Sequence, residues 1–388
     1  MNEVDVAVIG RGMIGSAAAR HLGEAGHTVA LIGSGEPADY ASATAPLSSH
    51  YDAGRITRIS SPNPIWSELA ARSISRYADI ADRSGIAIHD GRGLAQASLN
   101  TQAAIDNANA RGGSARAVDR EWLRATTGIE IRADHSGDLF YEEAPAGVIY
   151  PRALVAAQTQ LAHYAGVTLI DAPATAITRS GSAASVGFTI EAGATIEAQQ
   201  VLLATGAYGA SLVGVDLAIQ RRLRTITLAE LGPGTEIPSL IDDDPAHSAL
   251  DGIYWVPPLV FPDGRTWLKI GGDSLPMITA ETDADISAWF AGGGSQAEAD
   301  ALADTVRALL PDAEITGWNH KPCVVTYTEP SLPFLGFVDD GVAVALGASG
   351  SGAKSSDEIG RLAATLMSPR GWNDAELDLA SFTPQVNS

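Results

Sequence analysis

Residues 4–32 read VDVAVIGRGMIGSAAARHLGEAGHTVALI, and this stretch decides the fold. An apolar run leads into a G-x-G-x-x-G pattern, a segment of small residues follows, and a second apolar run occupies residues 28–32. That order predicts a strand, a tight turn, a helix and a second strand, the βαβ unit of a Rossmann-like domain. Backbone N–H groups at the start of such a helix bind the pyrophosphate of a dinucleotide. The residues that we expect there are Gly10, Gly12, Met13, Ile14 and Gly15.

The ribose of the dinucleotide is usually held by an acidic residue at the end of the second strand, where this chain has Gly33. Three alternatives stay open: Glu36 reaches back, Ser34 substitutes, or backbone and water hold the ribose. The stretch therefore predicts a dinucleotide but does not distinguish a nicotinamide from a flavin dinucleotide.

The composition is that of a globular protein with two domains. The chain has 388 residues, of which 45% are hydrophobic and 18% are charged. Its 46 acidic and 25 basic residues give a net charge of -21. Nucleic acid and anionic membrane surfaces would be repelled, so we expect neither as a partner. An anionic substrate would need cations placed locally in its site.

Several classes of site are disfavoured by the sequence. The single cysteine, Cys323, excludes an internal disulfide and a cysteine-based metal cluster. No H-x-x-x-H or H-E-x-x-H motif supports a metal site, and no G-x-S-x-G motif supports a hydrolase nucleophile. The first residues have no basic leader region, and no apolar run reaches membrane-spanning length, so we expect a cytoplasmic protein.

Residues 34–63 are rich in Gly, Pro, Ser and Ala, and they predict a long loop after the second strand. Loops of this length in compact domains are usually functional. The segment SSHYDAGRITR, residues 48–58, gathers polar and cationic groups in a chain that is short of positive charge. A solvated surface loop would carry such residues too, so on these residues alone both interpretations stay open.

Helical and strand patterns alternate along the rest of the chain. Periodicity or an opening proline predicts helices at residues 64–77, 100–111, 151–165 and 296–310. Apolar runs predict strands at residues 167–170, 188–190, 200–204 and 342–346. Between residues 216 and 267, runs such as TITLAEL and GIYWVPPLVF with a Pro-Asp-Gly turn predict an antiparallel sheet, and hence a second domain.

Two further glycine-rich turns follow apolar strands, where backbone could approach a nucleotide. LLATGAYG, residues 202–209, contains Thr205 and Gly206. GASGSGAKSSDEIG, residues 347–360, contains Gly350 and Gly352 before a predicted helix. Each signal is weak alone, because an ordinary strand-to-helix turn would look the same.

Taken in order, these pieces resemble one family. The opening glycine motif, SSHYDAGRITR, LLATGAYG, TWLKIGG, KPCVVTYTEPSLPFLG and GASGSGAKSSDEIG occur at about the separations found in the monomeric sarcosine oxidase and N-methyltryptophan oxidase family, FAD-dependent amine oxidases of the D-amino acid oxidase superfamily. The similarity spans about residues 4–366. It implies an α/β Rossmann-like FAD-binding domain over residues 1–87, 146–222 and 326–388. The mainly antiparallel substrate domain would take residues 88–145 and 223–325.

The resemblance implies roles around the flavin. Cys323 matches the family's cysteine that forms a thioether to the flavin 8α-methyl carbon, which would make FAD covalently bound. Lys269 matches the lysine that contacts the flavin N5 through water and promotes reaction with oxygen. Arg55 and His50 match positions against the flavin ring. Further residues implied in cofactor binding are Ser34, Ser48, Ser49, Thr205, Gly206, Gly350, Gly352 and Lys354.

The resemblance also implies a substrate site. Arg58 and Lys354 match the two cations that bind the substrate carboxylate, and Tyr254 and Trp255, with Tyr327, are candidates for the pocket walls or for ordinary core packing. Three departures fall on substrate contacts. Asp273 replaces a histidine, Val325 replaces a tyrosine, and the loop with the two arginines has one extra residue. Sarcosine itself therefore becomes doubtful as the substrate.

From this resemblance we expect a monomeric FAD-dependent oxidase of a secondary amine or N-substituted α-amino acid. It would transfer a hydride to flavin, release an imine that hydrolyses, and reduce O2 to hydrogen peroxide. A fructosyl amino acid or cyclic imino acid oxidase on the same scaffold remains an alternative. So do a flavin- or NADPH-dependent reductase or dehydrogenase and a nucleotide-binding module without turnover.

Overall fold

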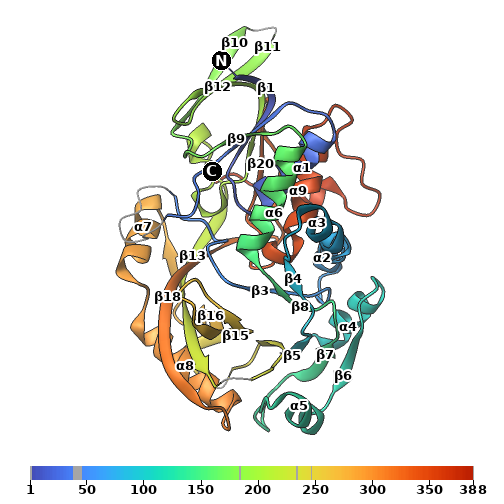
Figure 1. Cartoon of the computed structure of the whole chain (residues 1–388), viewed down its shortest axis with the longest axis vertical. Helices are drawn as coiled ribbons and strands as arrows, with labels where there is room; N and C mark the ends of the chain where they lie inside the picture. Colours follow the sequence, from blue (N-terminus) through green and yellow to red (C-terminus); the bar gives the residue numbers. More distant parts are fainter. Residues whose placement is uncertain (1, 38–45, 183–184, 233–234, 246, 388) are drawn as a thin grey trace.

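Two sheets organise the chain in the computed structural model, which describes residues 2–37, 46–182, 185–232, 235–245 and 247–387 (Figure 1). One sheet is mixed and carries the Rossmann-like unit, and the other is largely antiparallel. The predicted fold class is thus confirmed. The exact domain boundaries stay a prediction. The helices are α1 (Met13–Glu24), α2 (Pro64–Ser75), α3 (Tyr77–Ser84), α4 (Thr101–Asn109), α5 (Arg120–Thr127), α6 (Pro151–Tyr164), α7 (Asp283–Gly292), α8 (Gln296–Leu309) and α9 (Gly352–Met367).

The first sheet has the order β10-β11-β12-β1-β2-β9, with β20 beside β12 and β19 beside β20. Parallel pairing joins β9, β2, β1, β12 and β20 in turn, and α1, α6 and α9 lie along one side of these strands (Figure 1). Its strands are β1 (Asn2–Ile9), β2 (Val29–Ile32), β9 (Thr168–Ile170), β10 (Ala176–Ser182), β11 (Ser185–Glu191), β12 (Thr195–Leu203), β19 (Phe334–Asp339) and β20 (Val342–Leu346).

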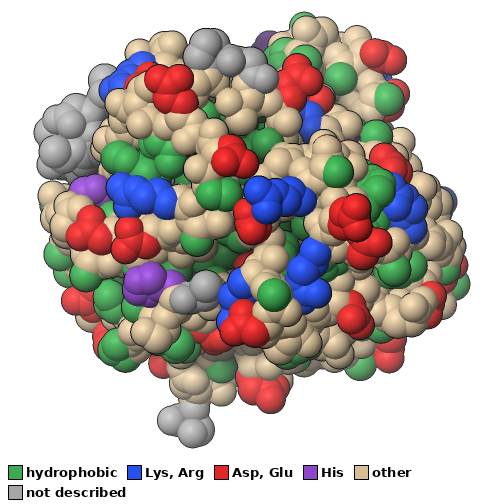
Figure 2. All heavy atoms as spheres, turned by 90° about the horizontal axis from the view of Figure 1, so that it is seen from below, with side chains coloured by type: hydrophobic (Ala, Val, Ile, Leu, Met, Phe, Trp, Pro, Cys, Tyr) green, Lys and Arg blue, Asp and Glu red, His purple; other side chains and the backbone are tan. Residues whose placement is uncertain are grey.

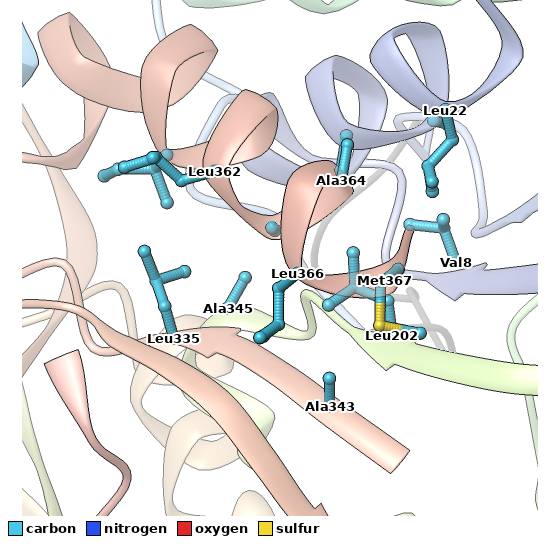
Figure 3. Close-up of a cluster of buried hydrophobic side chains, with 14 of the residues drawn as sticks. Val8, Leu22, Leu202, Leu335, Ala343, Ala345, Leu362, Ala364, Leu366 and Met367 are labelled. Atoms are coloured by element: carbon cyan, nitrogen blue, oxygen red, sulfur yellow. The ribbon is translucent and has the colours of Figure 1, made fainter. Parts of the chain in front are cut away.

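Apolar side chains on both faces hold this sheet in place. Val8 and Leu202 pack with the side chains of α1 and α9, among them Leu22 and Leu362 (Figure 3). The alternate residues of the strands pack into a second cluster on the other face. Each fully buried Val or Leu contributes about 1.5–3 kcal/mol. This packing fixes the first turns of α1 and α9 at the carboxyl ends of β1 and β20, where open α/β sheets bind ligands.

The second sheet has the order β17-β13-β16-β15-β14-β5-β7-β6, with β18 on the other side of β13. β15 and β16 are joined by the predicted turn at residues 262–264, and the Val-Pro-Pro run of β15 coincides with a break in the pairing register. Its strands are β5 (Leu94–Ser98), β6 (Ala115–Val118), β7 (Asp138–Glu142), β13 (Ile219–Leu231), β14 (Ser239–Asp242), β15 (Leu250–Val260), β16 (Thr266–Ser274), β17 (Ile278–Ala280) and β18 (Ile315–Thr328).

The long loop predicted over residues 34–63 is wrong in one part. Residues Arg55–Thr57 form β3, which pairs with β8 (Gly147–Ile149), and β8 also pairs with β4 (His89–Asp90). The partner strand lies about ninety residues further along the chain, so no local pattern announces the pairing. Consequently the two arginines of SSHYDAGRITR lie on and next to an ordered strand.

The four predicted helices and the four predicted short strands are all present, with ends shifted by a few residues. α3, α5 and α7 were not predicted. α5 is short and begins at an Asp119 cap, and α7 begins at a Thr282 capping box, which is a signal that the sequence does contain. Among the described residues, no helix is long and apolar enough to cross a membrane. Acidic and basic side chains are interspersed over the face shown in Figure 2.

Candidate active site

A cavity of about 640 Å3 is lined by segments of both sheets. The turn after β1, the end of β2, the loop before β3, the turn after β12 and the turn before α9 all reach it, and so do β13, β15, β16 and β18. The structure thus brings most of the predicted site residues together. Those that line the cavity are Gly10, Gly12, Met13, Ile14, Ser34, Ser48, Ser49, His50, Arg55, Arg58, Thr205, Gly206, Tyr254, Cys323, Gly350, Gly352 and Lys354.

The glycine turn has the geometry that a pyrophosphate needs. Gly12 caps α1 without a side-chain hydrogen bond, and a Cβ at Gly12 would meet no atom within 4 Å. The first N–H groups of the helix are therefore open to the cavity. Gly15 does not line the cavity. A Cβ there would lie 1.9 Å from the carbonyl oxygen of Gly10, so this glycine permits close packing of helix and strand.

The residues after β2 show which of the candidate groups is placed to hold the ribose of the dinucleotide. Both carboxylate oxygens of Glu36 accept hydrogen bonds from Arg152, at 2.7 and 2.6 Å, and Glu36 does not line the large cavity. Ser34 lines it, and the Ser34 hydroxyl is a buried group with no hydrogen-bond partner in the described part of the chain. A hydroxyl without a partner at the end of β2 fits a ribose hydroxyl of a dinucleotide.

Two cations, the buried Lys354 and the partly buried Arg58, face the cavity near the first turn of α9. Burial lowers the pKa of Arg58 and Lys354 from their ordinary values, Arg58 lowers that of Lys354 further, and Glu142 opposes the shift at both. Glu142 is fully buried and accepts hydrogen bonds from the backbone N–H groups of Ile59 and Ser60, at 2.8 and 3.0 Å. Asp243, which also lines the cavity, is a second counter-charge to Arg58, so Glu142 is the carboxylate that acts on both cations.

Cys323 is placed by the long pairing of β13 with β18. This register sets Cys323 opposite Arg224, and both side chains line the cavity. The Cys323 thiol is buried and not part of a disulfide. It therefore shares one cavity with the glycine turn and the two cations, as the covalent-flavin prediction requires.

Lys269 lies outside the cavity lining and is only 1% exposed. Its ammonium donates to the Asp52 carboxylate at 2.7 Å and to the carbonyl oxygen of Gly54 at 2.5 Å. Burial and the neighbouring Arg55 lower the pKa of Lys269 well below its ordinary value, whereas the Asp52 carboxylate favours the charged form. Asp52 also contacts the Arg55 guanidinium, so one carboxylate serves two cations.

His50 and Trp255 have contrasting surroundings. Burial lowers the pKa of His50 to about 4, and His50 Nδ1 has no hydrogen-bond partner in the described chain. This imidazole is thus neutral at pH 7.

Trp255 is fully buried in the core of the second sheet, and its indole N–H donates to the Pro238 carbonyl oxygen at 2.9 Å. The structure does not bring Trp255 to the cavity, whereas its neighbour Tyr254 points there because strand side chains alternate.

The glycine turn after β1 and the two further glycine-rich turns lie on one cavity, as a dinucleotide site requires, and the family comparison identifies the dinucleotide. Residues 5–366 match the family described as FAD dependent oxidoreductase. The chain belongs to this family. The family therefore implies FAD as the dinucleotide, whereas residues 4–32 alone did not distinguish a flavin from a nicotinamide dinucleotide. Among curated proteins, none matches the chain.

Solved structures show the same fold. NikD, an unusual amino acid oxidase essential for nikkomycin biosynthesis, has a TM-score of 0.77 and 19% identity, covering 100% of this chain and 98% of that chain. Glycine oxidase from Geobacillus kaustophilus has a TM-score of 0.72 and 23% identity, covering 99% and 98%. L-proline dehydrogenase from P. horikoshii has a TM-score of 0.77 and 14% identity, covering 98% and 97%.

Sequence reasoning missed three polar residues of this region. Asp52 lies within SSHYDAGRITR, so its position next to two arginines was a signal. Glu142 and Arg224 carried no such signal. Their importance depends on strands that are distant in sequence, since Glu142 meets residues 59 and 60 and Arg224 meets β16 and β18.

Proposed function

We propose that this protein is an FAD-dependent oxidase of a secondary amine or an N-substituted α-amino acid, similar to the sarcosine oxidases. The observation that carries the proposal is the presence of Arg58 and Lys354 in the same cavity as the glycine turn of the cofactor site. FAD would be held by the glycine turn and would supply a hydride acceptor for the carbon next to the substrate nitrogen and a route for electrons to O2, with an imine that hydrolyses and hydrogen peroxide as products.

The chain's own residues bind and orient the substrate. Arg58 and Lys354 hold its carboxylate, with Glu142 as their shared counter-charge. His50 stays neutral at pH 7 and adds no charge beside the flavin. Tyr254 forms a wall of the pocket, and Cys323 would hold the flavin through its sulfur. The structures of an amino acid oxidase and of glycine oxidase on this fold support an amino acid as the substrate class.

A second candidate is a dehydrogenase that passes electrons to an acceptor other than O2. The burial of Lys269 against Asp52, outside the cavity lining, favours it, because a lysine that does not face the cavity stabilises superoxide there less than one that does. The fold of L-proline dehydrogenase is compatible with such a role. A fructosyl amino acid or cyclic imino acid oxidase differs from the first candidate only in the shape of its pocket.

Flavin absorbance and peroxide release separate these candidates. N-methyl, cyclic and N-glycated amino acids are mixed with the holoenzyme first without oxygen and then in air. Flavin bleaching followed by stoichiometric peroxide indicates an oxidase, and bleaching without peroxide indicates the dehydrogenase. If no compound bleaches the flavin, both candidates are wrong.

The carboxylate site has its own test. Hydrogen bonds to charged groups contribute about 1.5–3 kcal/mol each, so Arg58→Ala should weaken binding of the best amino acid about tenfold to a hundredfold. The matching amine without a carboxylate should be affected far less. Arg92→Ala is the control, because Arg92 lies at the surface beside Asp90. Equal losses for acid and amine would contradict the carboxylate site.

A further inference from the structure

Three polar side chains on neighbouring strands form a second charged cluster in the cavity wall. Arg224 lies on β13, Asp273 on β16 and Tyr327 on β18, and all three line the cavity. Arg224 donates through Nη2 to the Tyr327 hydroxyl at 2.7 Å and contacts the Asp273 carboxylate.

Arg224 has a hydrogen-bond donor left over. The residue is 7% exposed, and its Nε–H is buried without a hydrogen-bond partner among the described residues. A buried guanidinium N–H without a partner costs free energy. The Tyr327 hydroxyl accepts from Arg224, so its own proton is free to be donated to another group. Arg224 and Tyr327, which both line the cavity, therefore each keep one donor without an acceptor among the described residues, and Glu298 Oε1 on α8 is a buried acceptor without a partner.

The cluster has more positive than negative charge. Asp273 is shared with a second guanidinium, that of Arg222, at 3.4 Å. Burial would lower the pKa of Arg224, but Tyr327 and Asp273 together raise it above its ordinary value, so Arg224 stays charged. Glu298 faces this region from α8. Its Oε2 accepts from the backbone N–H of Thr225 at 2.8 Å, and burial raises its pKa, which weakens it as a counter-charge.

We infer that Arg224 and Tyr327 form a second carboxylate subsite, so that the substrate is an N-substituted amino acid with an additional acidic group. The inference rests on the proposed function, since it takes the first carboxylate to be bound by Arg58 and Lys354. Val325 lines the cavity beside the cluster and supplies an apolar surface for the methylene groups between the two carboxylates. Val325 stands where the related family has a tyrosine, and its smaller side chain leaves room for a longer substrate.

Inert ligands test this subsite without turnover. Succinate, glutarate and adipate are titrated into the holoenzyme by calorimetry beside butyrate, pentanoate and hexanoate, which have the same chain lengths and one carboxylate. We expect at least one dicarboxylate to bind about tenfold more tightly than its monocarboxylate partner. Equal affinities within every pair would overturn the inference.

Substitutions of Arg224 and Tyr327 test whether these two residues cause the preference for dicarboxylates. Arg224→Met should reduce the preference to about one while monocarboxylates bind as before. Tyr327→Phe should reduce it several-fold, and it remains informative if Arg224→Met does not fold, because it removes only one hydroxyl. Arg265→Met is the control, since Arg265 lies in the turn between β15 and β16 and is paired with Glu230 outside the cavity. A preference that survives both cavity variants would contradict the subsite.

The outcome also separates this inference from the proposed function. If monocarboxylates bind and Arg58→Ala weakens them, the first carboxylate site stands whatever the dicarboxylates do. If neither series binds and substrates fail to bleach the flavin, the proposed function itself is wrong.

Discussion

Lys269 and Asp52 form a buried ion pair next to Arg55, and their charge balance bears on the reaction with oxygen. A fixed cation near the flavin would stabilise the superoxide that forms when oxygen takes an electron. Lys269 can act as this cation only if the Asp52 carboxylate does not cancel its charge. The resemblance implied an oxygen-activating lysine, whereas the geometry shows a lysine that is already paired, so an experiment must distinguish the two roles.

Replacing Lys269 by Met keeps the length of the side chain and removes its charge. If Lys269 promotes the reaction with oxygen, reoxidation of the reduced flavin should slow about a hundredfold, whereas anaerobic reduction by substrate should change little. Rapid-mixing absorbance measures both half-reactions. Lys321→Met is the control, because Lys321 lies on β18 outside the cavity lining.

A different result would assign Lys269 to structure alone. Unchanged reoxidation together with a lower free energy of unfolding would mean that Lys269 only compensates the buried Asp52 carboxylate. The dehydrogenase candidate would then gain support.

Cys323 is buried in the cavity wall, and its covalent attachment to flavin is a separate prediction. A thioether survives acid, whereas FAD bound without a covalent bond is released. We expect the yellow colour to stay with acid-precipitated protein, and Cys323→Ser to release it to the supernatant. Flavin that leaves the unmodified protein on precipitation would show that Cys323 is only a small buried side chain.

At the level of elements, a buried ionic network joins the helices that support the cofactor site. Asp357 on α9 accepts from Arg20 of α1 at 2.6 Å and from Arg76, between α2 and α3, at 2.5 Å. Gln158 of α6 donates to the same carboxylate at 2.8 Å. Burial would raise the pKa of Asp357, but His21, Arg76 and Arg20 together hold it well below its ordinary value.

Asp357→Asn should lower the free energy of unfolding by about 3–5 kcal/mol at pH 7, because it removes the buried carboxylate that Arg20 and Arg76 share and leaves them with Glu24 and Glu358. A carboxyl whose folded pKa is depressed stabilises the protein above its unfolded pKa. That contribution is lost as the pH falls towards the lower folded value. The difference between the two proteins should therefore persist at pH 5 and shrink only below the ordinary aspartate range.

Urea unfolding of both proteins at several pH values measures this difference. Asp304→Asn is the control, because Asp304 and its partner Arg307 lie at the surface, where such a pair contributes about 0–1 kcal/mol. Equal stabilities of Asp357→Asn and the unmodified protein would mean that apolar packing alone holds the helices together.

At the scale of the whole molecule, a net charge of -21 coexists with a cavity that contains several buried cations. Arg58, Lys354 and Arg224 come from three different regions of the chain, yet all line the same cavity. Local cations in an acidic protein are what the composition required for an anionic substrate. An acidic exterior would repel such a substrate at long range, so binding has to depend on these short-range contacts.

The sequence by itself determined the features that depend on local pattern. The glycine turn at residues 10–15, the periodic helices and the alternating strands each have a physical signal within a few residues. The order of motifs along the chain added the positions of Arg58, Cys323 and Lys354, which the structure brings into one cavity.

Only the tertiary structure decided how distant strands pair and which side chains then share charge. The pairing of β3 with β8, the burial of Lys269 against Asp52, and the contact of Arg224 with Asp273 and Tyr327 all depend on such pairing. Trp255 and Tyr254 look equally suited to a pocket in sequence, yet the pleat of β15 sends one to the core and the other to the cavity. The physical reason is that burial and charge partners are set by the register of non-local strands, about which a local pattern contains no information.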